Sequence, residues 1–328
     1  MARKRRKVCN SGIGGQAVLE GVMMKNKDMY AVSVRKPDGE IDVETAEYHG
    51  LLHGSKLTKL PFLRGVFAFF DSLILGMRTL NYSASFYEET DEAETKTDKA
   101  MKKVFGDKTE KVYSGITLVL SLVVAVALFI VLPYYLSTLL EKYVRQTSLL
   151  TIFEGIIRLA IFLAYIAAIT AMKDIKRLYM YHGAEHKCIN CIEHGHRLNV
   201  HNVKLSSRFH KRCGTSFLLF VMVISIIVFL FITAENPVLK VGLRILLLPV
   251  IAGLSYECIR LAGKSDNIFL TILSAPGVAL QRLTTKEPDE EMIEVAIKSV
   301  EAVFDWREFL KENFDVDKSD SEEDNEQN

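Results

Sequence analysis

Residues 112–140 read VYSGITLVLSLVVAVALFIVLPYYLSTLL and contain no charged side chain. A helix of about 20 apolar residues crosses the roughly 30 Å hydrocarbon core of a bilayer, so this stretch is long enough to span it, even with Pro133 near its end. Residues 214–234 form a second uncharged run of about the ~20 residues that a span needs. These two runs predict an α-helical membrane protein.

Two further segments are apolar but carry charges near their ends. Residues 151–172 contain Glu154 and Arg158, and residues 240–262 contain Arg244. Charged side chains close to the end of a span can reach the interface, so four spans are expected in all. The spacing of Glu154 and Arg158 favours a helical ion pair, and a path for a substrate is the alternative. Arg244 is expected to anchor its span at the interface.

Positive charge is distributed unevenly among the connecting segments. The segment before Lys111 is rich in Lys and Arg, residues 141–150 contain two, residues 173–213 contain nine, and residues 235–240 contain one. Basic loops are retained on the cytoplasmic side of a membrane. The pattern predicts a multi-pass protein of the cell membrane, with both termini and the 173–213 loop in the cytoplasm.

The whole chain of 328 residues is nearly neutral, with 41 basic and 40 acidic residues. This balance gives no reason to expect nucleic acid as a partner. The long uncharged runs instead make the lipid bilayer the expected partner. The five cysteines then lie in or beside the cytoplasm, where thiols stay reduced. Metal binding or simple burial is therefore expected of them rather than disulfide formation.

The N-terminal region has the pattern of a small folded unit. Residues 29–35 and 40–44 alternate apolar and polar side chains around the turn signal Pro37-Asp38-Gly39, which predicts a β-hairpin. The expected class is mainly α, a polytopic membrane protein with a small N-terminal α+β unit at the cytoplasmic face. Its expected parts are a hairpin unit (1–60), an interfacial amphipathic helix and charged connector (61–111), two spans (112–172), a His/Cys loop (173–213), two spans (214–262), an interfacial segment and helix (263–314) and an acidic disordered tail (315–328).

The chemistry is concentrated in the 173–213 segment. Its motif His182-Gly183-Ala184-Glu185-His186 places two imidazoles four residues apart, on one face of a helix. This is the H-x-x-E-H arrangement, in which the histidines bind a zinc ion and the glutamate is the general base. Six of the eight histidines and three of the five cysteines lie within residues 182–213. Some role in binding a divalent metal, zinc first, is therefore expected, catalytic or structural.

A catalytic zinc needs a third protein ligand and one open position. Many side chains could supply it: Cys188, Cys191, Glu193, His194, His196, His201, His210, Cys213 and, on the last expected span, Glu257. Glu257 lies where inverted zinc proteases find a downstream third ligand. Gly183 within the motif counts against a regular helix.

Several motifs together resemble those of the YqhQ-like bacterial membrane proteins. They are GGQAVLEGVMM (14–24), FLRG (62–65), YHGAEHK (181–187), RCGTSF (212–217) and LPVIAGLSYE (248–257). The similarity runs from about Gly12 to Thr285, and Lys211 stands where that family often has proline. The family has a domain of unknown function and is sometimes described as predicted metal-dependent enzymes. The resemblance implies a polytopic membrane protein and a metal site at His182, Glu185, His186, His210 and Cys213.

Two functions of different classes are thus expected. The first is a metal-dependent membrane hydrolase, with zinc held by His182 and His186 plus one of Glu257, His210 or Cys213, and with Glu185 as general base. The second is a protein without enzymatic activity, in which the metal staples the 173–213 loop. Such a protein would act as accessory partner of a translocase or transporter complex.

Overall fold

The computed structural model describes residues 8–87, 109–232, 234, 236–262 and 268–314. The chain folds into two compact units, which are treated separately below. Unit 1 is assembled from residues 1–87, 169–217 and 256–328, and unit 2 from residues 88–168 and 218–255. The basic start, the charged connector and the acidic tail expected from the sequence lie outside the described residues, at least in large part.

Unit 1 contains a four-stranded antiparallel sheet in the order β1 (Gly14–Val18), β2 (Gly21–Asn26), β3 (Met29–Arg35) and β4 (Ile41–Glu47). Strands β3 and β4 form the expected hairpin, with Arg35 opposite Ile41. Gly39 in the turn has a φ of 90°, a conformation that glycine adopts without strain. The hairpin predicted from alternation is therefore confirmed.

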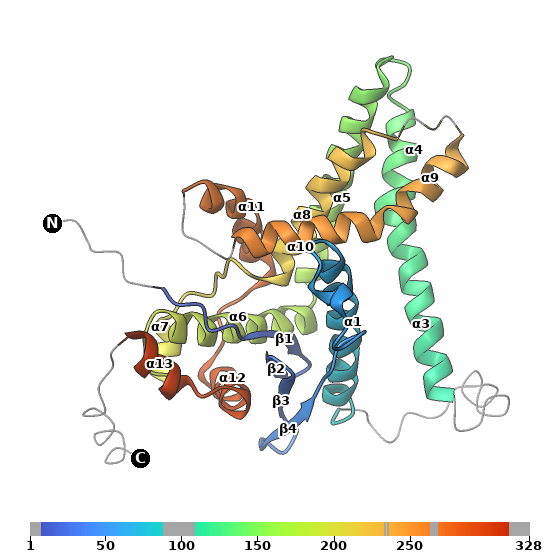
Figure 1. The fold of residues 1–328 in the computed structure, drawn as a ribbon. Coiled ribbons are helices and arrows are strands. Elements are labelled where there is room, and N and C mark those ends of the chain that lie inside the picture. Colours follow the sequence, from blue (N-terminus) through green and yellow to red (C-terminus); the bar gives the residue numbers. More distant parts are fainter. Residues whose placement is uncertain (1–7, 88–108, 233, 235, 263–267, 315–328) are drawn as a thin grey trace, which may run out of the picture. The chain divides into compact units, whose positions relative to one another are not determined.

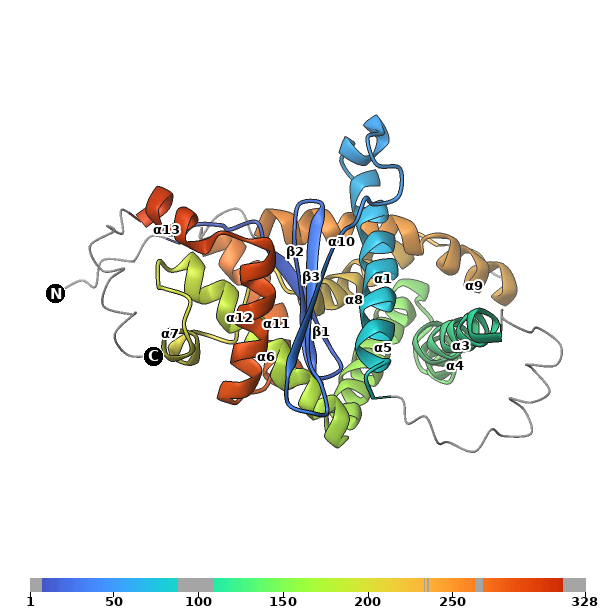
Figure 2. The ribbon, with the colours of Figure 1, turned by 90° about the horizontal axis from the view of Figure 1, so that it is seen from below.

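Both faces of this sheet are covered, because successive residues of β2 enter different cores. Val22 and Met24 pack in one core with α6 (Lys173–Glu193) and α12 (Glu290–Val303). Met23 packs in a second core with Leu75 of α1 (Leu63–Ala84). Figure 2 shows α6 and α12 on one side of the sheet and α1 on the other. The helix expected at the membrane interface thus packs on the sheet.

The remaining helices of unit 1 are η1 (Lys56–Lys59), α7 (Val200–Leu205), α11 (Ile268–Thr284) and α13 (Trp306–Phe314). The single helix expected at the end of the 263–314 part is two helices, because Asp305 caps a new start by accepting 3.0 Å bonds from the N–H groups of Arg307 and Glu308. Pro276 does not end α11, which continues through it.

Helix α6 occupies much of the segment expected to be a His/Cys loop. It begins after the extended Met172 and ends at His194, where Gly195 has a φ of 79°. Residues 183–193 are buried without exception, so this C-terminal part of the helix is covered on every side. Its polar side chains must therefore find partners within the protein.

Unit 2 holds the apolar helices (Figure 1): α3 (Thr109–Val126), the π-helical turn η3 (Ala127–Val131) and α4 (Leu132–Thr138), then α5 (Thr147–Thr170), α8 (Gly214–Phe229), α9 (Pro237–Leu246) and α10 (Leu248–Ala262). The last residues of α5 and α10 and the first residues of α8 belong to unit 1.

Fewer helices are suited to cross a membrane than the four expected. Within the described residues, Gly115–Thr138 and Thr147–Thr170 are long and apolar enough. The pair α9 and α10 qualifies only if its 41° bend is counted within one span, which makes three. Helix α8 has 16 residues and so reaches about 24 Å, short of the roughly 30 Å hydrocarbon core. The prediction of four spans is corrected to two or three.

The charged residues of these helices are buried and paired. Glu154 accepts a 2.6 Å bond from Arg158, as the spacing predicts. Arg244 is fully buried and donates a 2.6 Å bond to the other oxygen of Glu154. The expectation that Arg244 reaches the interface as an anchor is therefore wrong.

Candidate metal centre

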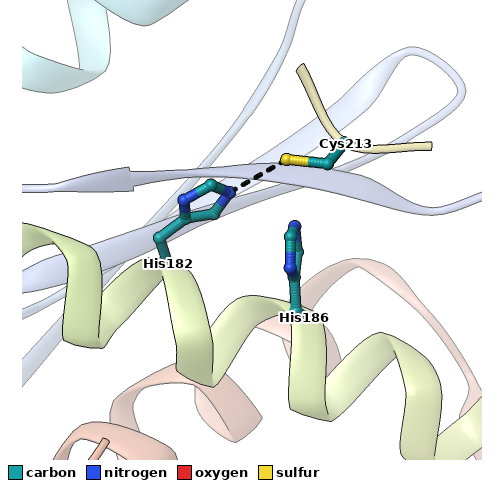
Figure 3. A group of neighbouring side chains, drawn as sticks. All are labelled: His182, His186 and Cys213. Carbon is teal, nitrogen blue, oxygen red and sulfur yellow. Dashed lines mark hydrogen bonds between the residues drawn. The ribbon is translucent and has the colours of Figure 1, made fainter. Parts of the chain in front are cut away.

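His182 and His186 lie on consecutive turns of α6, with their ring centroids 4.4 Å apart. Cys213 comes from the turn that precedes α8 and points at the same place (Figure 3). Its Sγ lies 3.2 Å from Nε2 of His182. The three ligand atoms all lie within 4.8 Å of one another. Donors around a tetrahedral zinc are about 3.5 Å apart, so the spacing fits such an ion.

Backbone carbonyls fix the orientation of both imidazoles. Nδ1 of His182 bonds the Thr284 carbonyl at 2.8 Å, and Nδ1 of His186 bonds the Arg208 carbonyl at 2.7 Å. A carbonyl only accepts, so each Nδ1 carries the proton and each Nε2 has a free lone pair. Histidines that bind metals are held in this way in most proteins.

The carbonyl of Thr284 reaches His182 because the chain after α11 lies against α6. The N–H of Lys286 donates to the Tyr179 carbonyl at 2.8 Å. A Cβ on Gly183 would lie 2.0 Å from the Lys286 carbonyl oxygen. Glycine inside the motif therefore permits this approach, and the helix is regular in spite of it.

The carbonyl of Arg208 reaches His186 because α6 holds the segment before Cys213. Lys187 donates 2.9 Å bonds to the carbonyls of Lys204 and Ser206. Asn190 donates to the carbonyls of Ser207 and Phe209, at 2.6 and 3.0 Å. Side chains on one face of α6 thus position the loop that carries the third donor.

Gln281 of α11 braces the same loop from the other side. Its amide accepts from the His210 N–H at 2.8 Å and donates to the His210 carbonyl at 2.7 Å. At Cys213, the N–H and hydroxyl of Thr215 lie 3.4 and 3.1 Å from Sγ. Both groups lie within hydrogen-bonding distance of the sulfur, and the thiolate is the form of cysteine that binds metals.

Glu185 is buried beside the two histidines. Burial raises the pKa of its carboxyl to about 7, although the electrostatic influence of the nearby His182 ring and of the Gly15 backbone acts in the opposite direction. A Cβ on Gly15 would lie 3.1 Å from the Glu185 carboxyl carbon and 2.5 Å from the Met23 carbonyl. Oε2 of Glu185 has no hydrogen-bond partner among the described residues.

Cys188 and Cys191 are buried on α6 and do not join the group. Burial raises the pKa of both thiols, that of Cys191 to about 12. Cys191 donates to the Arg197 carbonyl at 3.2 Å. Protonated, buried thiols pack as small apolar groups and are poor metal ligands.

His210 and Glu257, the other expected ligands, have different partners. The ring of His210 lies 5.7 Å from that of His186, and its Nε2 is 3.4 Å from Oε2 of Glu193. Glu257 accepts bonds from the Arg64 side chain and from the Phe62 N–H. Among the expected third ligands, Cys213 alone forms a group of three with the histidines in the described part of the chain.

Glu193, at the C-terminal end of α6, is a buried carboxylate next to His210. It accepts hydrogen bonds from Ser11 and Arg212. Burial acts to raise its pKa, but the bond with His210 and the charge of Arg212 outweigh it and hold the pKa at about 2. Burial lowers the pKa of His210. The sequence did not predict that Glu193 and Gln281 hold the segment around His210. The one signal available was Gln281, a polar residue within an apolar run.

Comparison with known proteins agrees with the resemblance seen in the motifs. The family described as "Protein of unknown function (DUF1385)" matches residues 60–306. The chain is 37% identical over 298 residues to the "Uncharacterized protein YqhQ" of Bacillus subtilis (strain 168), a match that covers 87% of this chain and 90% of the relative. No solved structure matches. The chain belongs to the DUF1385 family.

Proposed function

We propose that this protein binds one divalent transition metal ion, zinc first, at His182, His186 and Cys213. The observation that carries the proposal is the pair of carbonyl bonds at Nδ1, from Thr284 and Arg208, which leave both Nε2 lone pairs beside one thiol. Imidazole and thiolate are ligands for zinc and related metals, whereas Mg²⁺ and Ca²⁺ prefer oxygen.

A donor set of two histidines and one cysteine favours a catalytic site over a purely structural one. Structural zinc sites are closed by four protein ligands, whereas catalytic sites have three and an open position. Only three donors converge here within the described residues. A bound ion supplies a Lewis acid that polarises a carbonyl or phosphoryl oxygen and makes water more acidic.

Glu185 is the proposed general base of a hydrolase. A catalytic base works best with a pKa near the working pH, and burial brings that of Glu185 to about 7. Its Oε2, unpartnered in the described residues, is available to accept a proton. The backbone of Gly15 lies close to the same carboxyl group, which gives the segment Gly14-Gly15-Gln16 a role in positioning it.

A metal staple without catalysis is the second candidate. Two donors lie on α6, while Cys213 lies just before α8, so an ion would join two segments of unit 1. A protein stabilised in this way would serve as accessory partner of a translocase or transporter complex. Metal binding is common to both candidates, and Glu185 separates them.

The metal content of the purified full-length protein tests metal binding, which both candidate functions require. His182→Ala and Cys213→Ser should each lose most of the bound metal. His201→Ala, an exposed histidine of α7, is the matched control and should keep it. Equal metal content in all four proteins would reject the site.

Glu185→Gln tests the hydrolase. The amide cannot accept the proton, so we expect it to retain metal yet fail to complement a strain that lacks the protein, because a general base contributes about 10²–10⁴-fold to rate. If Glu185→Gln complements fully while His186→Ala does not, the staple is correct.

A further inference from the structure

Unit 2 contains three charged side chains buried among apolar helices. Glu154 and Arg158 of α5 and Arg244 of α9 are exposed by only 3%, 4% and 0% of their side-chain area. Both carboxylate oxygens of Glu154 are used, one by each arginine. Ionisable groups at membrane depth are costly and usually mark a binding site or a path.

Arg158 is fully engaged by the fold. It donates to the Phe129 carbonyl at 2.8 Å, to the Ser225 hydroxyl at 3.1 Å and to Glu154. Pro133, four residues after Phe129, has no N–H to donate to that carbonyl. Arg158 therefore satisfies a carbonyl that the proline leaves without its usual helical donor.

Arg244 is not satisfied in the same way. Its Nη2 bonds Glu154, but Nε and Nη1 have no partner among the described residues although both are buried. The guanidinium carbon lies 5.3 Å from the Tyr134 ring centre and 5.1 Å from that of Phe229. Two arginines share one carboxylate, so one positive charge in this cluster is left without a counter-charge.

A polar cavity of about 320 Å³ lies beside this cluster. Its walls include Glu154 and Tyr134, the two groups that Arg244 contacts. The other charged groups of the wall are the carboxylate of Glu141 and the two cations Lys240 of α9 and Arg145. Nζ of Lys240 lies 5.4 Å from the centre of the Tyr134 ring. The cavity is thus bordered by cations on more than one element.

The first turn of α5 adds to this positive field. Thr147, Leu150 and Thr151 line the cavity, and Thr147 is the first residue of that 24-residue helix. A helix N-terminus carries a partial positive charge and unsatisfied N–H groups, which favour anions. The cavity also borders the ends of α4 and α5, where a span meets the lipid headgroups.

We propose that this cavity binds a phosphate group, carried by an anionic lipid or by a small soluble phosphate ester. A cation is disfavoured because, of the two carboxylates in the wall, Glu154 is already shared by two arginines. Arg244 lies behind the wall residues Glu154 and Tyr134, and an anion in the cavity would offset its charge, whereas a neutral ligand would not. Arginine and lysine together are the side chains that bind phosphate. The volume admits a headgroup and excludes a protein segment.

Binding to the full-length protein in non-ionic detergent tests the proposal and identifies the source of the phosphate. The probes are phosphatidylglycerol in mixed micelles, glycerol 3-phosphate and inorganic phosphate, with isothermal calorimetry as the readout. Binding of the lipid alone assigns the site to a headgroup, and binding of the soluble probes alone assigns it to a phosphate ester. Failure of all three to bind at millimolar concentration would overturn the proposal.

Variants show whether any binding is in this cavity. Lys240→Gln and Arg145→Gln should each weaken binding by about tenfold or more, because each removes one charge next to the phosphate. Lys142→Gln, which removes the same charge from a neighbouring residue outside the cavity wall, should leave affinity unchanged. Neither test variant breaks the buried Glu154 cluster, so folding is preserved. Equal affinity in all of these proteins would also overturn the proposal.

Discussion

At the scale of single residues, two backbone carbonyls decide what the histidines can do. Thr284 and Arg208 hold the protons at Nδ1, so His182 and His186 present lone pairs at Nε2. The spacing of the motif predicted the shared helical face, because that depends only on helical periodicity. It did not predict these carbonyls, which come from segments about 100 and 20 residues away.

Gly183 gives the sharpest stability test at this scale. Alanine there should improve helix propensity by about 1 kcal/mol, yet its Cβ would lie 2.0 Å from the Lys286 carbonyl. We expect Gly183→Ala to lower the unfolding temperature and the metal content together. Gly115→Ala in α3, where a Cβ meets nothing within 4 Å, should be neutral or stabilising. Equal stability of Gly183→Ala and the unaltered protein would show that the close approach of the Lys286 carbonyl to Gly183 does not contribute to the fold.

Glu193 predicts how unit 1 responds to acid. Its pKa is about 2 when folded and about 4.5 when unfolded, so the carboxylate stabilises the fold above pH 4.5. That stability, roughly 3 kcal/mol at most, is lost as pH falls from about 4.5 to about 2. Thermal unfolding across this range should show a steeper loss for the unaltered protein than for Glu193→Gln. Parallel curves would contradict the assigned pKa.

At the scale of elements, apolar runs located the helices better than they located the spans. The run 214–234 was read as a full span, but α8 ends at Phe229 and is too short. The segment 240–262 bends by 41° near Leu247. Hydropathy measures composition and does not detect where a helix breaks. The positive charge of residues 173–213 predicts a loop between spans, with His182 and His186 on one face of a helix, whereas α6 covers half of this segment and buries its polar groups within unit 1.

Helix α11 acts on the metal centre through Gln281. Gln281→Leu keeps the volume but leaves the His210 N–H and carbonyl unpaired, at about 1–3 kcal/mol for each buried group. Metal affinity should also fall about 10–100-fold, because the loop that carries Cys213 loses its brace. Arg282→Leu, at the next and exposed position, should change neither. Unchanged thermal stability and metal affinity in Gln281→Leu would show that α11 does not support the metal centre.

At the scale of the whole molecule, the core of unit 1 constrains the topology. Val22, Cys188 and Met292 pack in one hydrophobic core. If the apolar helices cross a membrane, the segments before, between and after them therefore share one side of it. Each intervening stretch must then cross an even number of times. The two helices within residues 115–170 meet this condition. Because α8 is too short to span, the condition is met when neither α8 nor the bent α9–α10 pair crosses, which leaves two spans. Charge counting alone did not reveal this condition.

Cysteine labelling on intact cells tests this topology. Glu40→Cys, Lys204→Cys and Glu308→Cys place exposed thiols on the three segments of unit 1. A membrane-impermeant reagent should label all three only after the cells are opened, because basic segments are retained in the cytoplasm. The unaltered protein is the control for native thiols. Labelling of any one of the three from outside would contradict a shared cytoplasmic side.

The central claim is a metal ion held by two imidazoles and one thiolate, and the absorption spectrum of the cobalt-substituted full-length protein tests it most directly. Cobalt takes the place of zinc and reports both the geometry and the presence of a sulfur ligand. The account predicts one cobalt per chain, a tetrahedral spectrum and a thiolate-to-cobalt charge-transfer band that disappears in Cys213→Ser but persists in Cys258→Ser. A spectrum without that band, or one that Cys213→Ser leaves unchanged, would contradict it.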